Sequence, residues 1–158
     1  MRMQEPNRVV RWHPHHLELC ELNDFDAANI AMFPDYASYL ETYANAGMAF
    51  SVVDDGRISA MFGIWQLWPG VCEAWLIPSK HIGRKVVALH RGTLAFYEHV
   101  SERMNMKRLQ FSVHSSNATA CVWAERCYFT REGTMRSYGP DGADYYLYGR
   151  LFDGRFFR

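Results

Sequence analysis

Four basic side chains follow directly on a short apolar segment of this chain. The apolar segment is 71–77, and the basic residues are Lys80, His81, Arg84 and Lys85, which flank Gly83. Apolar residues then recur at helical spacing over 84–104, which predicts a long helix. The start of a helix carries unpaired N–H groups and a partial positive charge, and both favour a bound anion. The sequence therefore predicts a phosphate-binding site where this strand meets this helix.

The same basic residues have a second interpretation. Basic side chains are unfavourable against the dipole at the start of a helix, so their presence there is a mild indication of function. Runs of charge are nevertheless often only a solvated surface. Side chains that hold phosphates and side chains that merely face water remain two open alternatives.

Composition sets the class of protein around this segment. The 158 residues are 49% hydrophobic and 22% charged, and the net charge is zero, which favours one folded domain over 1–158 and argues against nucleic-acid binding. No apolar run is long enough for a membrane span. The four cysteines lack metal-ligand spacing and are interpreted as reduced thiols of a cytoplasmic protein. His13, His15 and His16 surround a proline without acidic partners, so we expect no metal site.

The order of the expected elements defines a mixed α/β fold. A strand over 8–12 precedes a helical region, three strands form an antiparallel meander, and the strand after the long helix is expected to run parallel to 71–77 because a helical crossover joins them. A helix and a closing pair of strands complete the chain. The expected ranges are helices 17–22, 25–32, 35–47, 84–104 and 118–126, strands 48–53, 58–68, 71–77, 108–114, 128–133 and 143–152, and a tail at 154–158.

A specific family resemblance appears at residues 117–129. This segment reads Asn-Ala-Thr-Ala-Cys-Val-Trp-Ala-Glu-Arg-Cys-Tyr-Phe, and it resembles the Asn-x-x-Ala-x-x-Leu-Tyr-x-Lys-x-Gly-Phe pattern of the GNAT N-acetyltransferases. Asn117, Ala120 and Phe129 match outright. Ala124 stands in place of the family tyrosine, and Tyr128 in place of the family glycine. Together with the element order, the resemblance covers nearly the whole chain.

The resemblance implies how a cofactor would bind. It implies a GNAT-like, largely antiparallel sheet with a splayed parallel pair and flanking helices, in which acetyl-CoA lies beside main-chain groups of Leu76 and Ile77. The family loop is rich in glycine, whereas this chain retains only Gly83, one place out of step. The basic side chains would then replace main-chain contacts to the pyrophosphate.

The resemblance also implies candidate catalytic residues. Glu73 lies where some family members carry a general base, and His114 is a second candidate; an exposed strand carboxylate and a capping histidine are the structural alternatives. Tyr128 or Tyr97 is a candidate acid in place of the missing family tyrosine. Asn117 could contact the cofactor or simply cap a helix. The acceptor is an amine that the sequence does not name.

A narrower resemblance is to small GNAT-like proteins of tailed bacteriophages, some of which are internal virion proteins. It is based on His15-His16, on residues 75–79, on the basic helix, and on Val113 with Asn117. It implies a second functional class, a catalytically silent structural or interaction protein in a virion or the host cytoplasm, with a phage or host protein as partner. Aromatic strands around Trp68 and Tyr145 fit either a core or a homo-oligomer interface.

Overall fold

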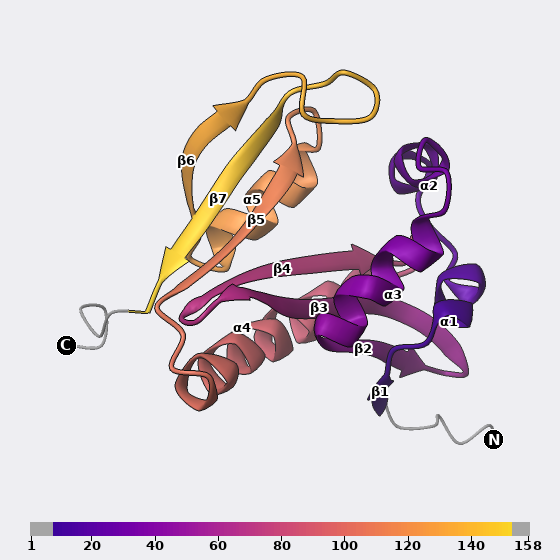
Figure 1. Ribbon diagram of the computed structural model, residues 1–158. Coiled ribbons are helices and arrows are strands. Elements are labelled where there is room, and N and C mark those ends of the chain that lie inside the picture. The colour runs from indigo at the N-terminus through magenta and orange to yellow at the C-terminus, as the bar shows by residue number, and fades with distance from the viewer. Residues whose placement is uncertain (1–7, 153–158) are drawn as a thin grey trace. The chain divides into compact units, whose positions relative to one another are not determined.

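The computed structural model describes residues 8–152, and Figure 1 traces their elements. Seven strands form a sheet in the order β1-β2-β3-β4-β5-β7-β6. The elements in chain order are β1 (Arg8–Arg11), α1 (Pro14–Leu19), α2 (Asp24–Ala31), α3 (Tyr36–Ala46), β2 (Gly47–Asp54), β3 (Arg57–Trp68), β4 (Val71–Pro78), the 3-10 turn η1 (Gly83–Lys85), α4 (Val86–Arg103), β5 (Arg108–His114), α5 (Ala118–Arg126), β6 (Thr130–Met135) and β7 (Tyr145–Leu151).

The chain divides into two compact units, and strands β3 and β4 run through both. The first unit comprises residues 1–65 and 75–84, and the second comprises 66–74 and 85–158. The pairs β1–β2, β2–β3, β5–β7 and β6–β7 are antiparallel, and the pair β4–β5 is parallel. The mixed fold class expected from the sequence is therefore confirmed. A single domain over 1–158 stays a prediction.

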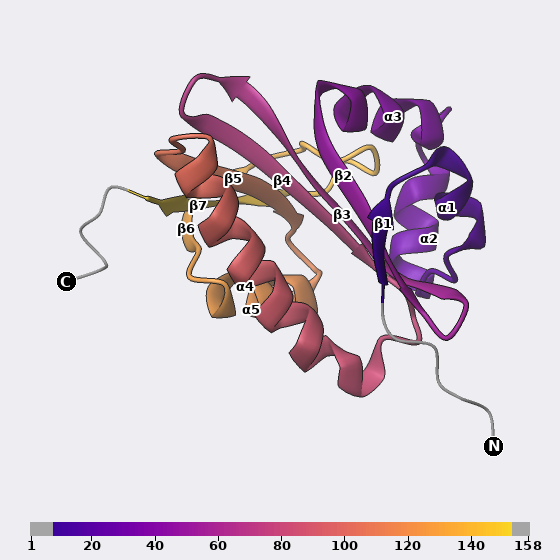
Figure 2. The same ribbon diagram turned by 90° about the horizontal axis from the view of Figure 1, so that it is seen from below.

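The first unit is built around an apolar core. Helices α1, α2 and α3 lie on one side of strands β1–β3 (Figure 2), and Leu40 of α3 is 2% exposed. Trp12 and Trp75 meet edge to face with 6.2 Å between their ring centroids. The buried members of this core are Trp12, Cys20, Leu40, Ala49, Ile58, Met61 and Ile77. Burial of these side chains supplies the main driving force for this unit.

The second unit is joined by a chain of aromatic contacts. The Phe129 ring lies edge-on to both Tyr97 of α4 and Phe111 of β5, with centroids 5.9 and 4.5 Å away. Phe111 in turn stacks on Tyr148 of β7. Burial raises the pKa of Tyr97 far above its ordinary value, so its hydroxyl stays neutral within the core. These rings hold α4 on strands β5 and β7.

Most expected elements agree with the structure, although several of their boundaries differ. The helix expected over 17–22 is α1 at Pro14–Leu19, because Pro14 occupies its first turn and His13 caps it: the His15 N–H donates to His13 Nδ1 at 3.2 Å. Tyr128 precedes β6 and belongs to the end of α5. The expected tail at 154–158 lies outside the described residues.

The two parallel strands, β4 and β5, were expected to splay apart. Its ladder joins Val71, Cys72 and Glu73 to Arg108, Leu109 and Gln110, all within the second unit. Beyond this ladder β4 continues to Pro78 and β5 to His114.

Candidate functional site

The loop after β4 belongs to the first unit, and hydrogen bonds from its main-chain N–H groups hold it in place. Ser79 is 3% exposed, its N–H donates to the Ser59 carbonyl at 2.9 Å, and its hydroxyl accepts the His81 N–H at 3.1 Å. The Lys80 N–H donates to the Glu21 carbonyl at 2.8 Å, and the Ile82 N–H to the Ser79 carbonyl at 3.2 Å. The N–H groups of four successive loop residues are therefore already engaged, and they are not available to a pyrophosphate.

Two of the predicted phosphate-binding side chains share one carboxylate. Glu21 Oε2 lies 2.7 Å from His81 Nε2 and 3.4 Å from Lys80 Nζ, and all three side chains are about half exposed. The hydrogen bonds from His81 and then Lys80 hold the pKa of Glu21 below its ordinary value, so it stays ionised near neutrality. Sequence reasoning missed Glu21, since nothing local links residues sixty positions apart.

Gly83 and Arg84 lead from this loop into the helix. Gly83 has a φ of +45°, and a Cβ there would meet nothing within 4 Å, so the backbone conformation and not crowding favours glycine. Arg84 is exposed and has no hydrogen-bond or ion-pair partner within residues 8–152. The backbone at this point is open to an approaching anion.

Lys85 is the residue before α4, and the helix start is uncapped by side chains. Lys85 makes no side-chain cap bond, and the first turn of this 18-residue helix holds no acidic residue. Its first N–H groups therefore receive no hydrogen bond from a capping side chain. The predicted helix start at Arg84 shifts by two residues, because Gly83–Lys85 forms a 3-10 turn.

Leu76 and Ile77 end β4 within the first unit. The Ile77 side chain is 7% exposed and belongs to the apolar core, whereas Leu76 is half-buried. Alternation along a strand sends these two side chains to opposite faces. Ile77 thus anchors the strand, and any ligand contact there falls to main-chain groups.

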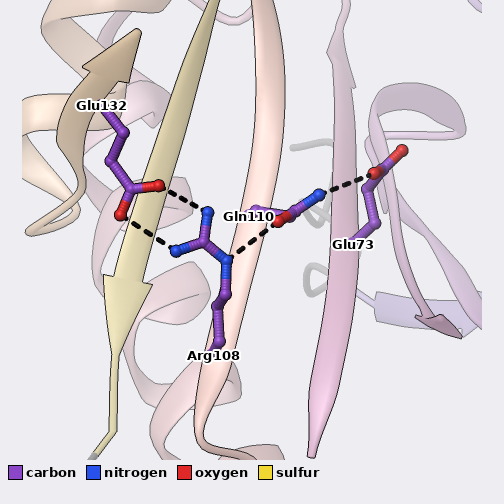
Figure 3. A network of polar contacts seen from close by, with 4 residues as sticks. All are labelled: Glu73, Arg108, Gln110 and Glu132. Carbon is purple, nitrogen blue, oxygen red and sulfur yellow. Dashed lines mark hydrogen bonds and ion pairs between the residues drawn. The ribbon is translucent and has the colours of Figure 1, made fainter. Parts of the chain in front are cut away.

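In the second unit, Glu73 belongs to a line of polar contacts between side chains of β4, β5 and β6 (Figure 3). Its Oε2 accepts from Gln110 Nε2 at 3.4 Å, and Gln110 Oε1 accepts from Arg108 Nε at 2.9 Å. Arg108 then donates two bonds to Glu132, at 2.9 and 2.5 Å. Glu73 Oε1 has no hydrogen-bond partner among residues 8–152. One oxygen of this carboxylate thus remains able to accept a proton.

His114 ends β5 and is 9% exposed. Its Nε2 lies 2.8 Å from Asp141 Oδ2, and its Nδ1 lies 2.9 Å from Ser116 Oγ and 3.2 Å from Ser116 N. The bond from His114 is the main reason that the pKa of Asp141 is lowered. Sequence reasoning selected His114 but missed Asp141, which lies 27 residues away.

Asn117 and His114 are adjacent at the start of α5. The Asn117 N–H donates to the His114 carbonyl at 2.9 Å, and Asn117 Oδ1 caps the helix by accepting the Ala120 N–H at 3.1 Å. The capping interpretation is therefore correct. A ligand contact through the amide Nδ2 stays a prediction.

Tyr128 lies just beyond the other end of α5. It has a φ of +66° and is 69% exposed. Its N–H donates to the Glu125 carbonyl, and the Phe129 N–H to the Ala124 carbonyl, which together form a Schellman ending. The family pattern has glycine here because this turn requires a left-handed residue. Ala124, at the position of the family tyrosine, is fully buried, and its methyl group has no proton to donate.

The clustering and burial of the cysteine and metal-ligating side chains bear on metal binding and on thiol chemistry. Residues 8–152 contain no group of three or more His, Cys, Asp or Glu side chains that could hold a metal ion. Burial raises the pKa of Cys20 and of Cys127 to about 11, so both thiols stay protonated. Within the same residues, no helix has the length and apolar character needed to span a membrane.

Solved structures that superimpose on this chain include acetyltransferases. The chain superimposes on a GNAT-family acetyltransferase from Bacillus anthracis with a TM-score of 0.70, 15% identity, and 94% and 96% of the two chains covered. It superimposes on an N-acetyltransferase from Staphylococcus aureus Mu50 with a TM-score of 0.66 and 14% identity, and 93% of this chain and 99% of that chain are covered. It superimposes on RimL, a ribosomal-protein α-N-acetyltransferase in complex with coenzyme A, with a TM-score of 0.67 and 13% identity. The match covers 93% of this chain and 94% of that chain.

No family model and no curated protein sequence matches this chain. The likeness to solved structures therefore establishes the fold, and the fold is that of the GNAT acetyltransferases.

Proposed function

We propose that this protein is an N-acetyltransferase that takes its acetyl group from acetyl-CoA and transfers it to an amine. The observation that carries the proposal is the start of α4, which Lys85 precedes and which has no side-chain cap, in a chain with the GNAT fold. Uncapped helix N–H groups and neighbouring cations favour a bound pyrophosphate. Acetyl-CoA supplies an activated thioester when bound.

The residues present fit this cofactor through side chains more than through the loop backbone. The N–H groups of residues 79–82 are engaged, whereas a Cβ at Gly83 would meet open space and the Arg84 guanidinium has no partner among residues 8–152. Arg84 and Lys85 are consecutive in the chain and would hold phosphate oxygens. Contacts from Lys80 and His81, once released from Glu21, stay predictions. Main-chain groups of Leu76 and Ile77 would position the acyl end.

An amine nucleophile must lose a proton before or during attack. Glu73 offers one carboxylate oxygen without a partner, and His114 offers an imidazole held by Asp141; either group could accept that proton. The Tyr128 hydroxyl is a candidate donor to the departing thiolate, and Asn117 Nδ2 a candidate cofactor contact. These assignments stay predictions, as do a homo-oligomer and a cytoplasmic or virion location.

A catalytically silent GNAT-fold protein is the second candidate. Two observations favour it: Glu21 occupies Lys80 and His81, and buried Ala124 replaces the family tyrosine. In this role the same surface would engage a phage or host protein instead of an acyl donor.

Calorimetric titration with acetyl-CoA separates the two candidates. We expect binding by the unmodified protein, a raised melting temperature, and loss of both in the double variant Arg84→Glu with Lys85→Glu. The matched control is Arg57→Glu with Arg91→Glu, which makes the same charge change at two exposed positions elsewhere. Undiminished binding in the first variant would reject the phosphate role. No binding by the unmodified protein would favour the silent protein.

Turnover is tested with acetyl-CoA and a panel of small amines and peptide amino termini. Release of coenzyme A thiol that depends on the amine would establish the reaction. A Glu73→Gln variant should then lose about a hundredfold in rate if Glu73 is the base, and a His114→Asn variant if His114 is.

A further inference from the structure

A serine, a histidine and an aspartate form a chain of hydrogen bonds near the end of β5. Ser116 Oγ lies 2.9 Å from His114 Nδ1, and His114 Nε2 lies 2.8 Å from Asp141 Oδ2. All three residues belong to the second unit. A hydroxyl hydrogen-bonded to an imidazole that is oriented by a carboxylate is the arrangement that activates serine for acyl transfer.

The neighbouring backbone fixes the protonation of the imidazole. The Ser116 N–H can only donate, and it points at His114 Nδ1 at 3.2 Å. Nδ1 is therefore the unprotonated nitrogen, and Nε2 carries the hydrogen that it donates to Asp141. The basic nitrogen thus faces the serine hydroxyl, as proton removal from that hydroxyl requires.

The histidine is buried and the serine is exposed, as an activated serine requires. His114 is 9% exposed, and its ring centroid lies 5.1 Å from that of Tyr145, so the imidazole is shielded from bulk water. Ser116 is exposed, so its hydroxyl is reachable by an acyl donor. Asp141 stays ionised, because its hydrogen bonds to His114 and to the Ala143 N–H lower its pKa.

The start of α5 supplies donors beside the serine. Three N–H groups at this helix end are engaged: Asn117 with the His114 carbonyl, Ala120 with Asn117 Oδ1, and Cys121 with the Asn117 carbonyl. Those of Ala118 and Thr119 belong to the first turn and have no acceptor within the helix. Such groups, two and three residues after Ser116, can stabilise an oxyanion that forms on an acyl group.

We propose that Ser116, His114 and Asp141 form an acyl-accepting serine site for activated esters and thioesters. Ser116 Oγ attacks the acyl carbonyl carbon, and its proton passes to His114 Nδ1. The bond from the acyl carbon to the leaving oxygen or sulfur breaks, and the leaving group takes the proton from Nδ1. Water or an amine then attacks the acyl-serine, gives a proton to Nδ1, and releases the acyl product, while Nδ1 returns the proton to Oγ.

This activity goes beyond the proposed acetyl-CoA site, because it uses residues of the second unit alone and needs no phosphate contact. The probe is p-nitrophenyl acetate, which contains no coenzyme. We expect a burst of p-nitrophenolate, one acetyl group added per chain, and its location by peptide mass spectrometry on Ser116. The Ser116→Ala variant should lose the burst, with at least a tenfold drop in the initial rate.

Matched variants separate chemistry from folding. Ser115→Ala removes the neighbouring hydroxyl and should keep the burst. Asp141→Asn keeps the shape of the side chain and should lower the acylation rate about tenfold to a hundredfold with an unchanged melting temperature. The probe ester contains no coenzyme, so failure of the acetyl-CoA proposal leaves this test intact.

Two results would overturn the proposal. Equal acylation of the unmodified protein and of Ser116→Ala would show that the serine does not react. Acetyl groups found on lysines without Ser116 would show the same. In either case the contacts to His114 Nδ1 only stabilise the turn between β5 and α5.

Discussion

Arg108 of β5 and Glu132 of β6 join across the intervening strand β7, directly over Gly149. Their two hydrogen bonds measure 2.9 and 2.5 Å, and Figure 3 shows them passing over that strand. A Cβ at position 149 would lie 2.7 Å from Glu132 Oε1 and 2.9 Å from Arg108 Nη1. The absence of a side chain at Gly149 is therefore what leaves room for the ion pair.

Gly149→Ala should destabilise the second unit. The added methyl pushes the ends of the Arg108 and Glu132 side chains aside, and because this ion pair is partly exposed we expect the free energy of unfolding to fall by no more than about 1 kcal/mol. Urea unfolding followed by circular dichroism measures it. Gly133→Ala is the control, since a Cβ there meets nothing within 4 Å, and it should change stability by no more than about 0.5 kcal/mol. Equal effects of the two variants would contradict this account.

The same ion pair should contribute to acid sensitivity. The hydrogen bond from Arg108 lowers the pKa of Glu132 from its ordinary 4.5. A carboxyl whose folded pKa is lowered stabilises the fold above its ordinary pKa, and this contribution is lost as the pH falls through the lowered value. Glu132→Gln should therefore reduce stability at pH 7 by less than about 1 kcal/mol and flatten the fall below pH 4.5. If the free energy of unfolding falls equally with pH in the unmodified protein and in Glu132→Gln, the ion pair makes no contribution to acid sensitivity.

Glu21 should weaken binding at the basic loop. Its carboxylate holds Lys80 and His81, so Glu21→Gln should tighten coenzyme A binding about twofold to fivefold by releasing both cations. Calorimetry measures the change. Glu18→Gln is the control, since it removes the same charge from a residue that pairs with His15. If the unmodified protein binds coenzyme A and Glu21→Gln binds equally or more weakly, the competition is absent. If neither binds, the acetyl-CoA proposal itself fails.

Variants of Asn117 can separate helix capping from ligand binding. Asn117→Ala removes the cap to the Ala120 N–H and should cost about 1 kcal/mol of stability. Asn117→Asp keeps a capping oxygen and should retain that stability, yet it lacks the amide N–H. A loss of coenzyme A affinity in the aspartate variant would assign a ligand contact to Nδ2. Unchanged affinity at full stability would leave the cap as its role.

Tyr128→Gly should stabilise the protein. Tyr128 has a φ of +66°, a conformation that costs a residue with a Cβ about 1 kcal/mol, and its side chain is 69% exposed. Tyr128→Ala is the matched comparison, since it removes the ring but keeps the Cβ. We expect the glycine variant to exceed the alanine variant by about 1 kcal/mol in urea unfolding. Equal stability of the two would show that the turn carries no strain.

Local patterns in the sequence determined the elements and their order. Apolar periodicity, the turns near Gly56 and Gly70, and the caps at Asn23 and Asn117 act within a few residues, so they could be recognised without the fold. The parallel direction of β5 followed from the helix before it. The start of α1 was predicted at residue 17 and lies at Pro14, because proline suits the first turn of a helix.

The tertiary structure decided which charged groups meet. Glu21 and Lys80 are brought together by the bridge between Leu22 and Ser79, and Arg108 reaches Glu132 because β7 inserts between β5 and β6. His114 meets Asp141 through the loop that joins β6 to β7. Partner choice at such distances depends on strand order and register, which no local pattern encodes.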